Sequence, residues 1–423
     1  MTLRTELTEA SAERHLGAIC FKIGPPALVG VEAEWFVHDA RCPGSPVDPD
    51  RVAAALAVLP DSADGPVLPA GSRLTREPGG QVELSSPPAA DPARCAAGLS
   101  ADQAALRAAL ATEGLRLTGS GTDPMDRERR MLADHPRYRA MGRYFDRGGP
   151  WGRIMMTGTA SVQVCVDAGT EADCVERWRL THELGPVLVA AFANSPLLEG
   201  RPTGWKSTRQ LVWSRMDPSR TLAPPPSADP RDAWARYVLD AALLCVRRSG
   251  GVPWDAPAGL TFRGWLRGAG ERPATLADLD YHRTTLFPPV RPHGYLELRM
   301  MDAQPGEGWR VPLALVSALL DDPVAADEAR AALERLGHAG SRAPRSGLWR
   351  RAAALGMADP DLRRAALLCF AAAERSLARR GSELRTPLVE FAERYPARGR
   401  CPADDQLAAL RAGAAVLQED APC

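Results

Sequence analysis

The sequence of 423 residues has very little lysine and no excess of charge of either sign. Lys22 and Lys206 are its only lysines, and 52 basic residues balance 52 acidic ones. A chain with no net charge has no electrostatic reason to bind nucleic acid or an anionic membrane. We therefore expect neither as a partner.

Long hydrophobic runs and patterned cysteines are also missing. No stretch approaches the ~20 consecutive apolar residues of a membrane-spanning helix, and the first residues contain no apolar run typical of a secretion signal. The nine cysteines are scattered without a CxxC pair, which indicates reduced thiols. We expect a soluble, cytoplasmic protein that is long enough for a large core or two lobes.

Two common nucleotide-binding motifs are absent as well. Residues 204–207 (GWKS) have a tryptophan between the glycine and the lysine that a Walker loop places side by side. Residues 119–121 (GSG) lack the third glycine of a dinucleotide fingerprint, and no β-α-β alternation surrounds them. Any nucleotide would therefore be held by a sheet and metal ions rather than by a helix N-terminus.

What the sequence does contain is an acidic turn followed by a strand, at residues 76–86 (REPGGQVELSS). Pro78 presets φ, and the two glycines after it supply conformations that residues with a Cβ avoid, which is typical of a turn. The following residues alternate between polar and apolar side chains, as in a half-buried strand. Glu77 therefore precedes the turn, and Glu83 projects from the polar face of the strand beyond it. A solvated acidic turn is the simpler interpretation of this segment alone.

Residues 28–37 (LVGVEAEWFV) are a second strand candidate with two acids. Glu32 and Glu34 are two residues apart, which on a strand places both carboxylates on one face. An edge strand with a solvated face would explain this pattern equally well. Because the opposite face and both flanks are strongly apolar, we interpret the segment as a central strand.

Two later segments repeat the alternation. Residues 155–166 predict a strand with Gln163 on its polar face, and residues 294–300 (GYLELRM) place Glu297 and Arg299 on one face. If the four strands pair in one antiparallel sheet, they form an open funnel with acids on its inside. We expect five acids there: Glu32, Glu34, Glu77, Glu83 and Glu297.

Unpaired carboxylates gathered in a partly buried cleft repel each other and cost on the order of several kcal/mol each to desolvate. Divalent cations are the plausible remedy, and ligation by oxygen atoms alone suits Mg²⁺ or Mn²⁺ rather than zinc. Four arginines interleave with these acids: Arg209, Arg283, Arg291 and Arg299. Carboxylates, metal and arginines together suit phosphoryl transfer, although each arginine alone is better explained as a surface or ion-pair residue.

Helical periodicity fills much of the remaining chain. Helices are predicted over 1–25, 51–59, 91–117, 178–192 and 231–248, with a helix or turn over 137–145 and a loop from 281 to 292. From about residue 311 onward the chain is helical, with breaks near 338–347 and 381–387. The sequence therefore predicts an α+β fold with a helical C-terminal region.

Four segments in this order resemble the glutamate–cysteine ligase family, and most closely its plant-type and actinobacterial branch, which includes the actinobacterial enzymes of ergothioneine biosynthesis. They are GVEAE at 30–34, EPGGQVELS at 77–85, MM and TASVQV within 155–164, and LELR at 296–299. The EPGGQ-x-ELS string is specific, whereas the ExE and LELR pieces are informative only together.

The resemblance implies a glutamine-synthetase-like fold, in which an antiparallel sheet forms an open funnel with helices outside. Residues 1–310 would form this catalytic domain, and residues 311–423 would pack on it as a helical region. The family uses ATP to phosphorylate the γ-carboxylate of L-glutamate, and the amine of L-cysteine then attacks the acyl phosphate. The expected cofactors are therefore ATP and Mg²⁺, with Mn²⁺ as a possible replacement.

Carried over to this chain, the resemblance also assigns residues to roles. The metal ligands or their direct partners would be Glu32, Glu34, Glu77, Glu83 and Glu297. The residues that face the phosphates would be Arg299, Arg283 and Arg291. The contacts to nucleotide or substrate would be Gln163, Lys206 and Arg209.

Two other functions stay open at this point. A related carboxylate–amine ligase could use an acceptor other than cysteine, and a non-catalytic relative could bind a nucleotide or an amino acid to regulate a partner. The five acids argue against the second alternative, because a pure binding protein has little use for so many desolvated charges. The sequence does not define the oligomeric state.

Overall fold

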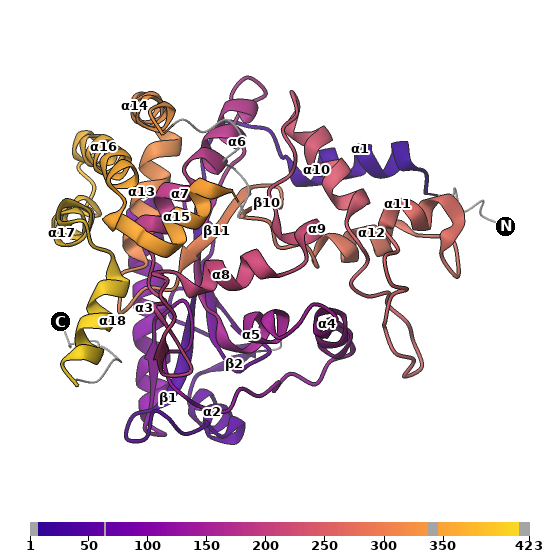
Figure 1. Cartoon of the computed structure of the whole chain (residues 1–423), viewed down its shortest axis with the longest axis horizontal. Coiled ribbons are helices and arrows are strands. Elements are labelled where there is room, and N and C mark those ends of the chain that lie inside the picture. Colours follow the sequence, from indigo (N-terminus) through magenta and orange to yellow (C-terminus); the bar gives the residue numbers. More distant parts are fainter. Residues whose placement is uncertain (1–6, 63–64, 337–345, 414–423) are drawn as a thin grey trace.

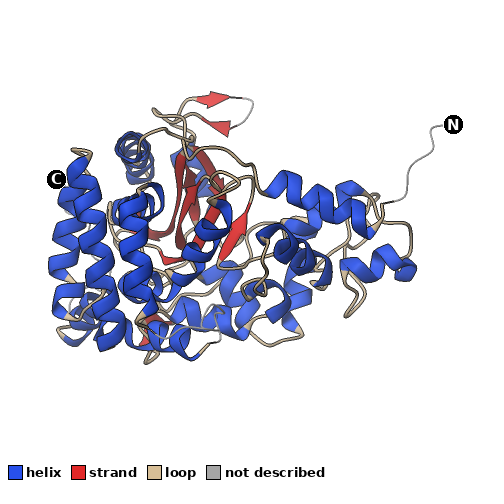
Figure 2. Ribbon diagram, turned by 90° about the horizontal axis from the view of Figure 1, so that it is seen from above, coloured by secondary structure: helices blue, strands red, loops and turns tan. Residues whose placement is uncertain are grey.

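The structure is a computed structural model that describes residues 7–62, 65–336 and 346–413. An antiparallel sheet lies at its centre, with helices around it (Figure 2). The sheet has seven strands in the order β10-β11-β7-β1-β5-β4, with β6 paired to the end of β1. Its strands are β1 (Val29–Asp39), β4 (Arg73–Arg76), β5 (Val82–Ser85), β6 (Leu115–Thr118), β7 (Ser161–Val166), β10 (Val290–Pro292) and β11 (Leu296–Asp302). The predicted α+β fold with an open sheet is confirmed.

The four strands predicted from alternation are direct neighbours in this sheet. β1 pairs with β5 on one side and with β7 on the other, and β7 pairs with β11. Along β5, Val82 and Leu84 are buried, while Glu83 and Ser85 are partly exposed on the opposite face. The period of two in the sequence therefore reports a real division between an apolar and a polar face.

The predicted strand over 155–166 is wrong in its first half. Helix α5 (Trp151–Gly158) occupies this part, and β7 begins only at Ser161. The hydroxyls of Thr157 and Thr159 donate to carbonyl oxygens four residues back, both at 2.8 Å. These hydroxyls are satisfied by backbone carbonyls of the helix and need no contact with solvent. Their alternation with apolar residues therefore does not indicate a strand with one solvated face.

Three other boundaries differ from the prediction. The helix expected over 231–248 ends at Asp240, as α10 (Pro230–Asp240). The helix expected over 178–192 is two helices, α6 (Cys174–Glu183) and α7 (Gly185–Ala191), because Pro186 has no N–H group to continue the first. The helix expected over 91–117 ends at Ala111 and is followed by β6. The chain reverses between them at Gly114, whose φ of 64° favours glycine.

Part of the loop expected from 281 to 292 is also regular structure. Helix α12 (Leu276–Arg283) enters it, and residues 290–292 form β10 at the edge of the sheet. Proline lacks an N–H donor and is tolerated in a strand at an edge, so Pro292 concealed this strand from prediction.

Helices cover the apolar face of the sheet. Helix α3 (Pro92–Ala111) packs on β1, β5 and β6, and α13 (Arg310–Asp321) packs on β1 and β7. One hydrophobic cluster joins the strands to the helices of the C-terminal region. These are α14 (Pro323–Glu334), α15 (Gly347–Leu355), α16 (Pro360–Arg379) and α17 (Arg385–Arg394). Helix α18 (Pro402–Arg411) packs through a separate small cluster of Ala193, Cys401 and Ala403, and all five helices gather on one side in Figure 1.

The start of α13 at Arg310 coincides with the predicted division between residues 1–310 and 311–423, and the division into domains stays a prediction. The break expected near 338–347 falls largely outside the described residues. The break expected near 381–387 is present as the turn between α16 and α17.

Further helices lie around the other edges of the sheet. They are α1 (Glu9–Cys20), α2 (Pro49–Leu56), α4 (Pro136–Asp146), α8 (Thr208–Arg215), α9 (Pro218–Thr221), α10 (Pro230–Asp240) and α11 (Phe262–Gly264). Two short strand pairs lie outside the main sheet: β2 (Asp61–Ser62) pairs with β3 (Gly65–Pro66), and β8 (Leu197–Leu198) pairs with β9 (Arg201–Pro202). None of the helices in the described part of the chain combines the length and apolar character that a membrane span requires. The eight cysteines in the described ranges are all free.

Candidate functional site

The polar face of the sheet places its acids in cross-strand register. Glu34 on β1 lies opposite Glu83 on β5, and Glu32 on β1 lies opposite Gln163 on β7. Like charges directly opposite each other on neighbouring strands destabilise a sheet. A sequence that concentrates them in its central strands has a local conflict, and such conflicts are typical of functional sites.

The turn between β4 and β5 brings Glu77 to the same face. The Glu77 N–H donates to the Gln81 carbonyl at 2.8 Å, the Gly80 N–H donates to the Glu77 carbonyl at 2.9 Å, and Gly80 has a φ of 90°. Gly79 is required for another reason, because a Cβ at this position would lie 2.5 Å from the Cα of Thr157 on α5. The turn therefore packs directly against α5.

These acids line a cavity of about 460 Å³ between the sheet and helices α4, α5 and α8. The predicted site residues that line it are Glu32, Glu34, Glu77, Glu83, Gln163, Arg209, Arg291 and Arg299. Glu297 lies directly behind the cavity wall, where Arg291 and Arg299 cover it. Residues from five strands and four helices thus converge on one space.

Neutral donors hold Glu34 and Glu83 in place. The carboxylate of Glu34 accepts hydrogen bonds from the Ser161 N–H at 2.8 Å, the Ser161 hydroxyl at 2.9 Å and the Gln163 amide at 2.9 Å. Glu83 accepts a hydrogen bond from the Thr75 hydroxyl at 2.7 Å. These bonds fix the direction of each carboxylate but do not balance its charge.

Burial and mutual repulsion raise the pKa of three of these acids. Burial, followed by the charges of Glu297 and Glu83, raises the pKa of Glu32 to about 8. Burial and the charge of Glu83 raise the pKa of Glu34 to about 7, and burial with Glu34 and Glu83 raises the pKa of Glu77 to about 8. We call Glu32, Glu34, Glu77 and Glu83 the acid cluster. In the described ranges, none of its members forms an ion pair with arginine or lysine.

Glu297 has the opposite environment. It is 1% exposed, and it accepts hydrogen bonds from Nε of Arg291 at 2.6 Å and Nη2 of Arg291 at 3.0 Å, with Nη1 of Arg299 also 3.0 Å away. Burial alone would raise its pKa, but the two guanidinium groups outweigh burial and lower the pKa of Glu297 to about 2. We call Arg291, Glu297 and Arg299 the arginine clamp. Its carboxylate is ionised and its charge is already balanced.

The acid cluster has the donor set that a hard cation prefers. Carboxylate oxygens without cationic partners suit Mg²⁺ or Mn²⁺. A further group of possible ligand atoms, on Glu32, Cys165 and Glu297, lies within 4.8 Å of one another. Burial raises the pKa of the Cys165 thiol well above its usual value, so the thiol stays protonated and is a poor ligand. The acid cluster therefore fits a hard cation better than this second group does.

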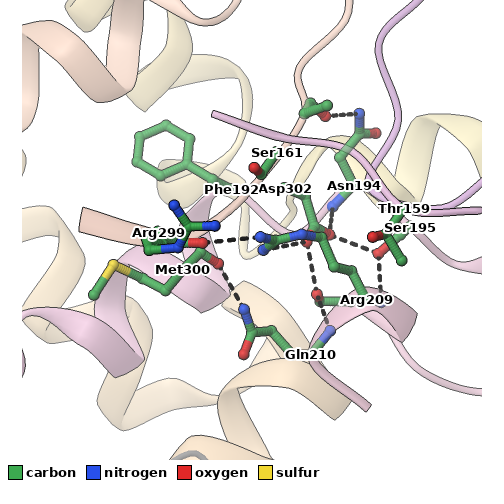
Figure 3. A network of polar contacts seen from close by, with 12 residues as sticks. Thr159, Ser161, Phe192, Asn194, Ser195, Arg209, Gln210, Arg299, Met300 and Asp302 are labelled. Carbon is green, nitrogen blue, oxygen red and sulfur yellow. Dashed lines mark hydrogen bonds and ion pairs between the residues drawn. The ribbon is translucent and has the colours of Figure 1, made fainter. Parts of the chain in front are cut away.

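Arg209 reaches the cavity from helix α8. Its side chain is almost fully buried, and its guanidinium lies 4.6 Å from the centre of the Trp213 ring. Its Nη2 donates to the Arg299 carbonyl at 2.9 Å (Figure 3). Its Nε and Nη1 make no hydrogen bond to any part of the chain that the structure describes. A buried guanidinium with unused donors at a cavity wall suits an anionic ligand.

Two predicted residues lie apart from the cavity. Lys206 precedes α8 and pairs through Nζ with Asp404 of α18 at 2.5 Å. Arg283, at the end of α12, contacts the His293 ring at 3.1 Å. Neither side chain lines the cavity, and the roles assigned to them from the sequence stay predictions.

Sequence reasoning assigned no role to the wall that faces the sheet. Arg137 on α4 donates to the hydroxyl and the carbonyl of Thr284 at 2.7 and 2.8 Å, and it lies 5.3 Å from the centre of the Tyr281 ring. Tyr138 and Trp213 line the same wall. The basic, aromatic character of 137–145 is the available signal, but nothing in the sequence tells which face of the sheet this helix covers.

A second cavity, of about 440 Å³, lies on the other side of the turn and shares Glu77 with the first. Its lining includes four arginines: Arg76, Arg127, Arg129 and Arg130. Arg127 is held by Asp123 through an ion pair of 2.5 Å and donates to the Val37 carbonyl at 2.9 Å. Glu77 thus lies between the cavity over the sheet and a second cavity whose lining mixes these arginines with Asp50, Asp123 and Glu128.

Comparison with known proteins gives a family match that covers most of the chain. The model of glutamate–cysteine ligase family 2 (GCS2) matches residues 28–419. The glutamate–cysteine ligase EgtA of Mycolicibacterium smegmatis is 42% identical over 95% of this chain and 96% of its own length. The enzyme of the same name from Mycobacterium tuberculosis is 39% identical over 95% of this chain and 90% of its own. A chloroplastic glutamate–cysteine ligase of Medicago truncatula is 34% identical over 59% of this chain and 50% of its own.

Two solved structures share the fold. The glutamate–cysteine ligase of Francisella tularensis in complex with AMP has a TM-score of 0.53 and 13% identity, covering 93% of this chain and 86% of its own. The bifunctional glutathione synthetase of Pasteurella multocida has a TM-score of 0.52 and 14% identity, covering 97% of this chain and 53% of its own. At these identities the similarity concerns the arrangement of strands and helices alone.

Proposed function

The chain belongs to glutamate–cysteine ligase family 2, and we propose on this basis that it joins L-glutamate to L-cysteine at the expense of ATP. The γ-carboxylate of glutamate attacks the γ-phosphorus of ATP, which gives γ-glutamyl phosphate and ADP. The amine of cysteine then attacks the acyl carbon, phosphate leaves, and γ-glutamylcysteine is released. Supply of this dipeptide to ergothioneine biosynthesis fits the two EgtA relatives, which are 42% and 39% identical over 95% of this chain.

One observation carries the proposal. A single cavity is lined both by carboxylates that have no ion-pair partner among the described residues and by guanidinium groups. A reaction that moves a phosphoryl group between two anions needs both, because charge on the phosphoryl oxygens must be neutralised while the reactants are held in line. A protein that merely binds an amino acid has no need of four desolvated acids in one cluster.

The acid cluster would hold Mg²⁺. When bound, this ion would neutralise phosphate charge and help to orient the nucleotide. The carboxylates of Glu34 and Glu83 are already aimed by Ser161 and Thr75, so binding would require little reorganisation of either side chain. Glu77 borders both cavities, which makes it the residue most directly placed between nucleotide and amino acid.

The two cavities divide the substrates between them. ATP would enter from the second cavity, where Arg76 could accompany its phosphates toward Glu77. Glutamate and cysteine would occupy the cavity over the sheet, with Arg299 and Arg209 beside the transferred group. Tyr138 and Arg137 form the wall that such amino acids would contact.

The deciding experiment is release of ADP and phosphate by the purified protein. We expect release only when glutamate, cysteine, ATP and Mg²⁺ are all present, together with γ-glutamylcysteine detected by mass spectrometry. A panel of other amines tests the alternative acceptor, because release with another amine and not with cysteine would assign a different ligase. Binding of ATP without turnover of any amine would favour the non-catalytic alternative.

A variant links the activity to the cavity. Glu83→Gln keeps the size and the hydrogen-bonding capacity of the side chain but removes its charge. We expect turnover to collapse while the melting temperature changes little, because Glu83 has no ion pair to lose among the described residues. Unchanged turnover would remove Glu83 from the site.

A further inference from the structure

Asp302, at the end of β11, is a buried acid that none of the steps above uses. It is 1% exposed. One carboxylate oxygen accepts hydrogen bonds from the Ser195 hydroxyl at 2.6 Å and the Asn194 N–H at 2.9 Å, and the other accepts from the Ser207 hydroxyl at 3.0 Å. Nη1 of Arg209 lies 3.9 Å from this second oxygen (Figure 3). Burial of an ionised carboxylate is costly, so a position with this many partners calls for an explanation.

The same contacts attach helix α8 to the end of the sheet. The Ser195 hydroxyl, which donates to Asp302, accepts from the Arg209 N–H at 3.1 Å. The Ser207 hydroxyl, which also donates to Asp302, accepts from the Gln210 N–H at 3.2 Å. Both hydroxyl protons are therefore directed at Asp302, because each oxygen already receives a bond from the first turn of α8.

The backbone at Gly121 approaches this carboxylate so closely that no side chain fits between them. A Cβ at Gly121 would lie 2.4 Å from the carboxyl carbon of Asp302. The Asn194 side chain closes the other side by donating to the Gly119 and Ala303 carbonyls at 3.0 and 2.8 Å. Asp302 thus has one well-defined position, which in turn fixes the position of the side chain that pairs with it.

Arg209 is the residue that depends on this position. Its Nη2 bonds the Arg299 carbonyl, its ring partner is Trp213, and Asp302 is its only ion-pair partner in the described ranges. A guanidinium that is only 2% exposed needs a nearby negative charge, and one that must bind a ligand needs donors left over. Asp302 meets both needs, because it lies near Nη1 without forming a hydrogen bond to it.

We propose that Asp302 is a positioning residue, which holds the Arg209 guanidinium at the cavity wall so that its unused N–H groups bind an anionic group of a substrate. The group is a carboxylate or a phosphoryl group, and the proposal rests on the ligase function above. Asp302 itself does not line the cavity and touches no substrate.

A double-mutant cycle tests this proposal. The variants are Asp302→Asn, Arg209→Gln and the two combined, and kcat and KM are measured separately for glutamate and for ATP. Loss of one charge-assisted contact to a ligand weakens binding on the order of tenfold or more. We expect Asp302→Asn to raise the KM for one of the two anionic substrates by about this factor, and that substrate identifies the group as carboxylate or phosphoryl.

The decisive comparison is made in the Arg209→Gln background. If Asp302 acts through Arg209, Asp302→Asn should change KM less than about twofold there, since coupled residues are not additive. An equal effect in both backgrounds, or an unchanged KM for both substrates in the single variant, would overturn the proposal. Asp359→Asn is the matched control, because Asp359 is 2% exposed and caps α16 far from the cavity, and its kinetics should stay within twofold of the parent.

Two further measurements keep the test independent of folding and of turnover. If Asp302→Asn does not fold, Ser207→Ala removes one bond to Asp302, and its effect must likewise vanish in the Arg209→Gln background. Calorimetric titration with L-glutamate and with ADP repeats the cycle as binding constants. An inactive parent protein would then refute the ligase function, whereas the binding cycle would still decide the role of Asp302.

Discussion

Glutamates on two parts of one sheet face have opposite environments, which shift their pKa values in opposite directions. On β1 and β5, and in the turn before β5, four glutamates have no cationic partner in the described structure, and the pKa of Glu32 and Glu77 is raised to about 8. On β11, Glu297 is held by Arg291 and Arg299, and its pKa is lowered to about 2. Glu297 is the most buried of these acids and still has the lowest of these pKa values, so the placement of the arginines rather than burial decides the difference.

The difference indicates how the two parts work. The arginine clamp needs no ligand to neutralise its carboxylate, because two guanidinium groups already contact Glu297. The acid cluster is incomplete until a cation or protons bind, since its repulsion and desolvation are relieved by a bound cation or by protonation of its carboxylates. The arginine clamp therefore contributes to the stability of the protein, whereas the acid cluster is built to bind a ligand. The following predictions test this division.

Replacement of Glu77 by Gln should have the largest effect. The variant removes one charge from the acid cluster at the point where both cavities meet, and metal-assisted charge stabilisation of several kcal/mol corresponds to a loss on the order of 100-fold to 1,000-fold in kcat. Stability should stay equal or rise, because an unbalanced buried charge is removed. Steady-state ADP release and thermal unfolding measure the two effects.

The control for this variant is Glu390→Gln on the exposed face of α17, which should leave both quantities unchanged. An inactive Glu77→Gln protein that is also strongly destabilised would contradict the division, because it would make Glu77 part of the structural framework.

Replacement of Arg291 by Met should act mainly on stability. It leaves Glu297 buried with one guanidinium instead of two, so the free energy of unfolding should fall by about 2–3 kcal/mol, somewhat less than for loss of a sole partner. Denaturant unfolding measures the change. A second substitution, Glu297→Gln, should recover part of it.

The matched control is Arg385→Met, which breaks the exposed pair with Glu374 and should cost less than about 1 kcal/mol. Equal losses in the two variants would show that the clamp is no more structural than a surface ion pair.

The sequence predicted the acid cluster well because both of its determinants are local. The spacing of Glu32 and Glu34 fixes a shared face by the period of a strand, and the turn chemistry at Pro78, Gly79 and Gly80 fixes the direction of Glu77. The confirmed neighbour relation of the four strands follows from their apolar faces. Local pattern therefore accounts for the half of the site that lies on β1 and β5.

The remainder depends on contacts between distant segments, which no local pattern encodes. Arg291 and Arg283 belong to the same sequence neighbourhood, yet only Arg291 reaches Glu297, because β10 pairs with β11 while the α12 end turns toward His293. Lys206 forms an ion pair with Asp404, which is 198 residues further along the sequence. The α4 wall with Arg137 is placed by its bonds to Thr284, across 147 residues.

The pH dependence of stability should separate the two parts further. A carboxylate whose pKa is raised from 4.5 to about 8 in the native state binds more protons there than in the unfolded chain, so its stabilising effect is present at low pH and lost as pH rises toward 8. The melting temperature of metal-free protein should therefore fall, by about 5 °C, between pH 6 and pH 8.5. Circular dichroism with EDTA measures this.

Mg²⁺ should reverse the fall, and its stabilising effect should grow with pH, because protons and the cation compete for the same carboxylates. The Arg291→Met variant should show the same slope in this pH range, since Glu297 is ionised throughout. A melting temperature that rises with pH in EDTA would contradict the raised pKa values.

The smallest effect tests how the acid cluster is aimed. The Thr75 hydroxyl donates to Glu83 at 2.7 Å and is the strongest neutral contact of this carboxylate. Thr75→Val keeps the shape of the side chain but removes the donor, and the loss of such an outer contact should raise the Mg²⁺ concentration for half-maximal activity by about tenfold. Thr75→Ser is the control, because it keeps the hydroxyl and should behave like the parent. If Thr75→Val changes kcat at saturating Mg²⁺ while the Mg²⁺ requirement stays the same, Glu83 acts on the substrates directly, and the division between a cation-binding part and an anion-binding part must be redrawn.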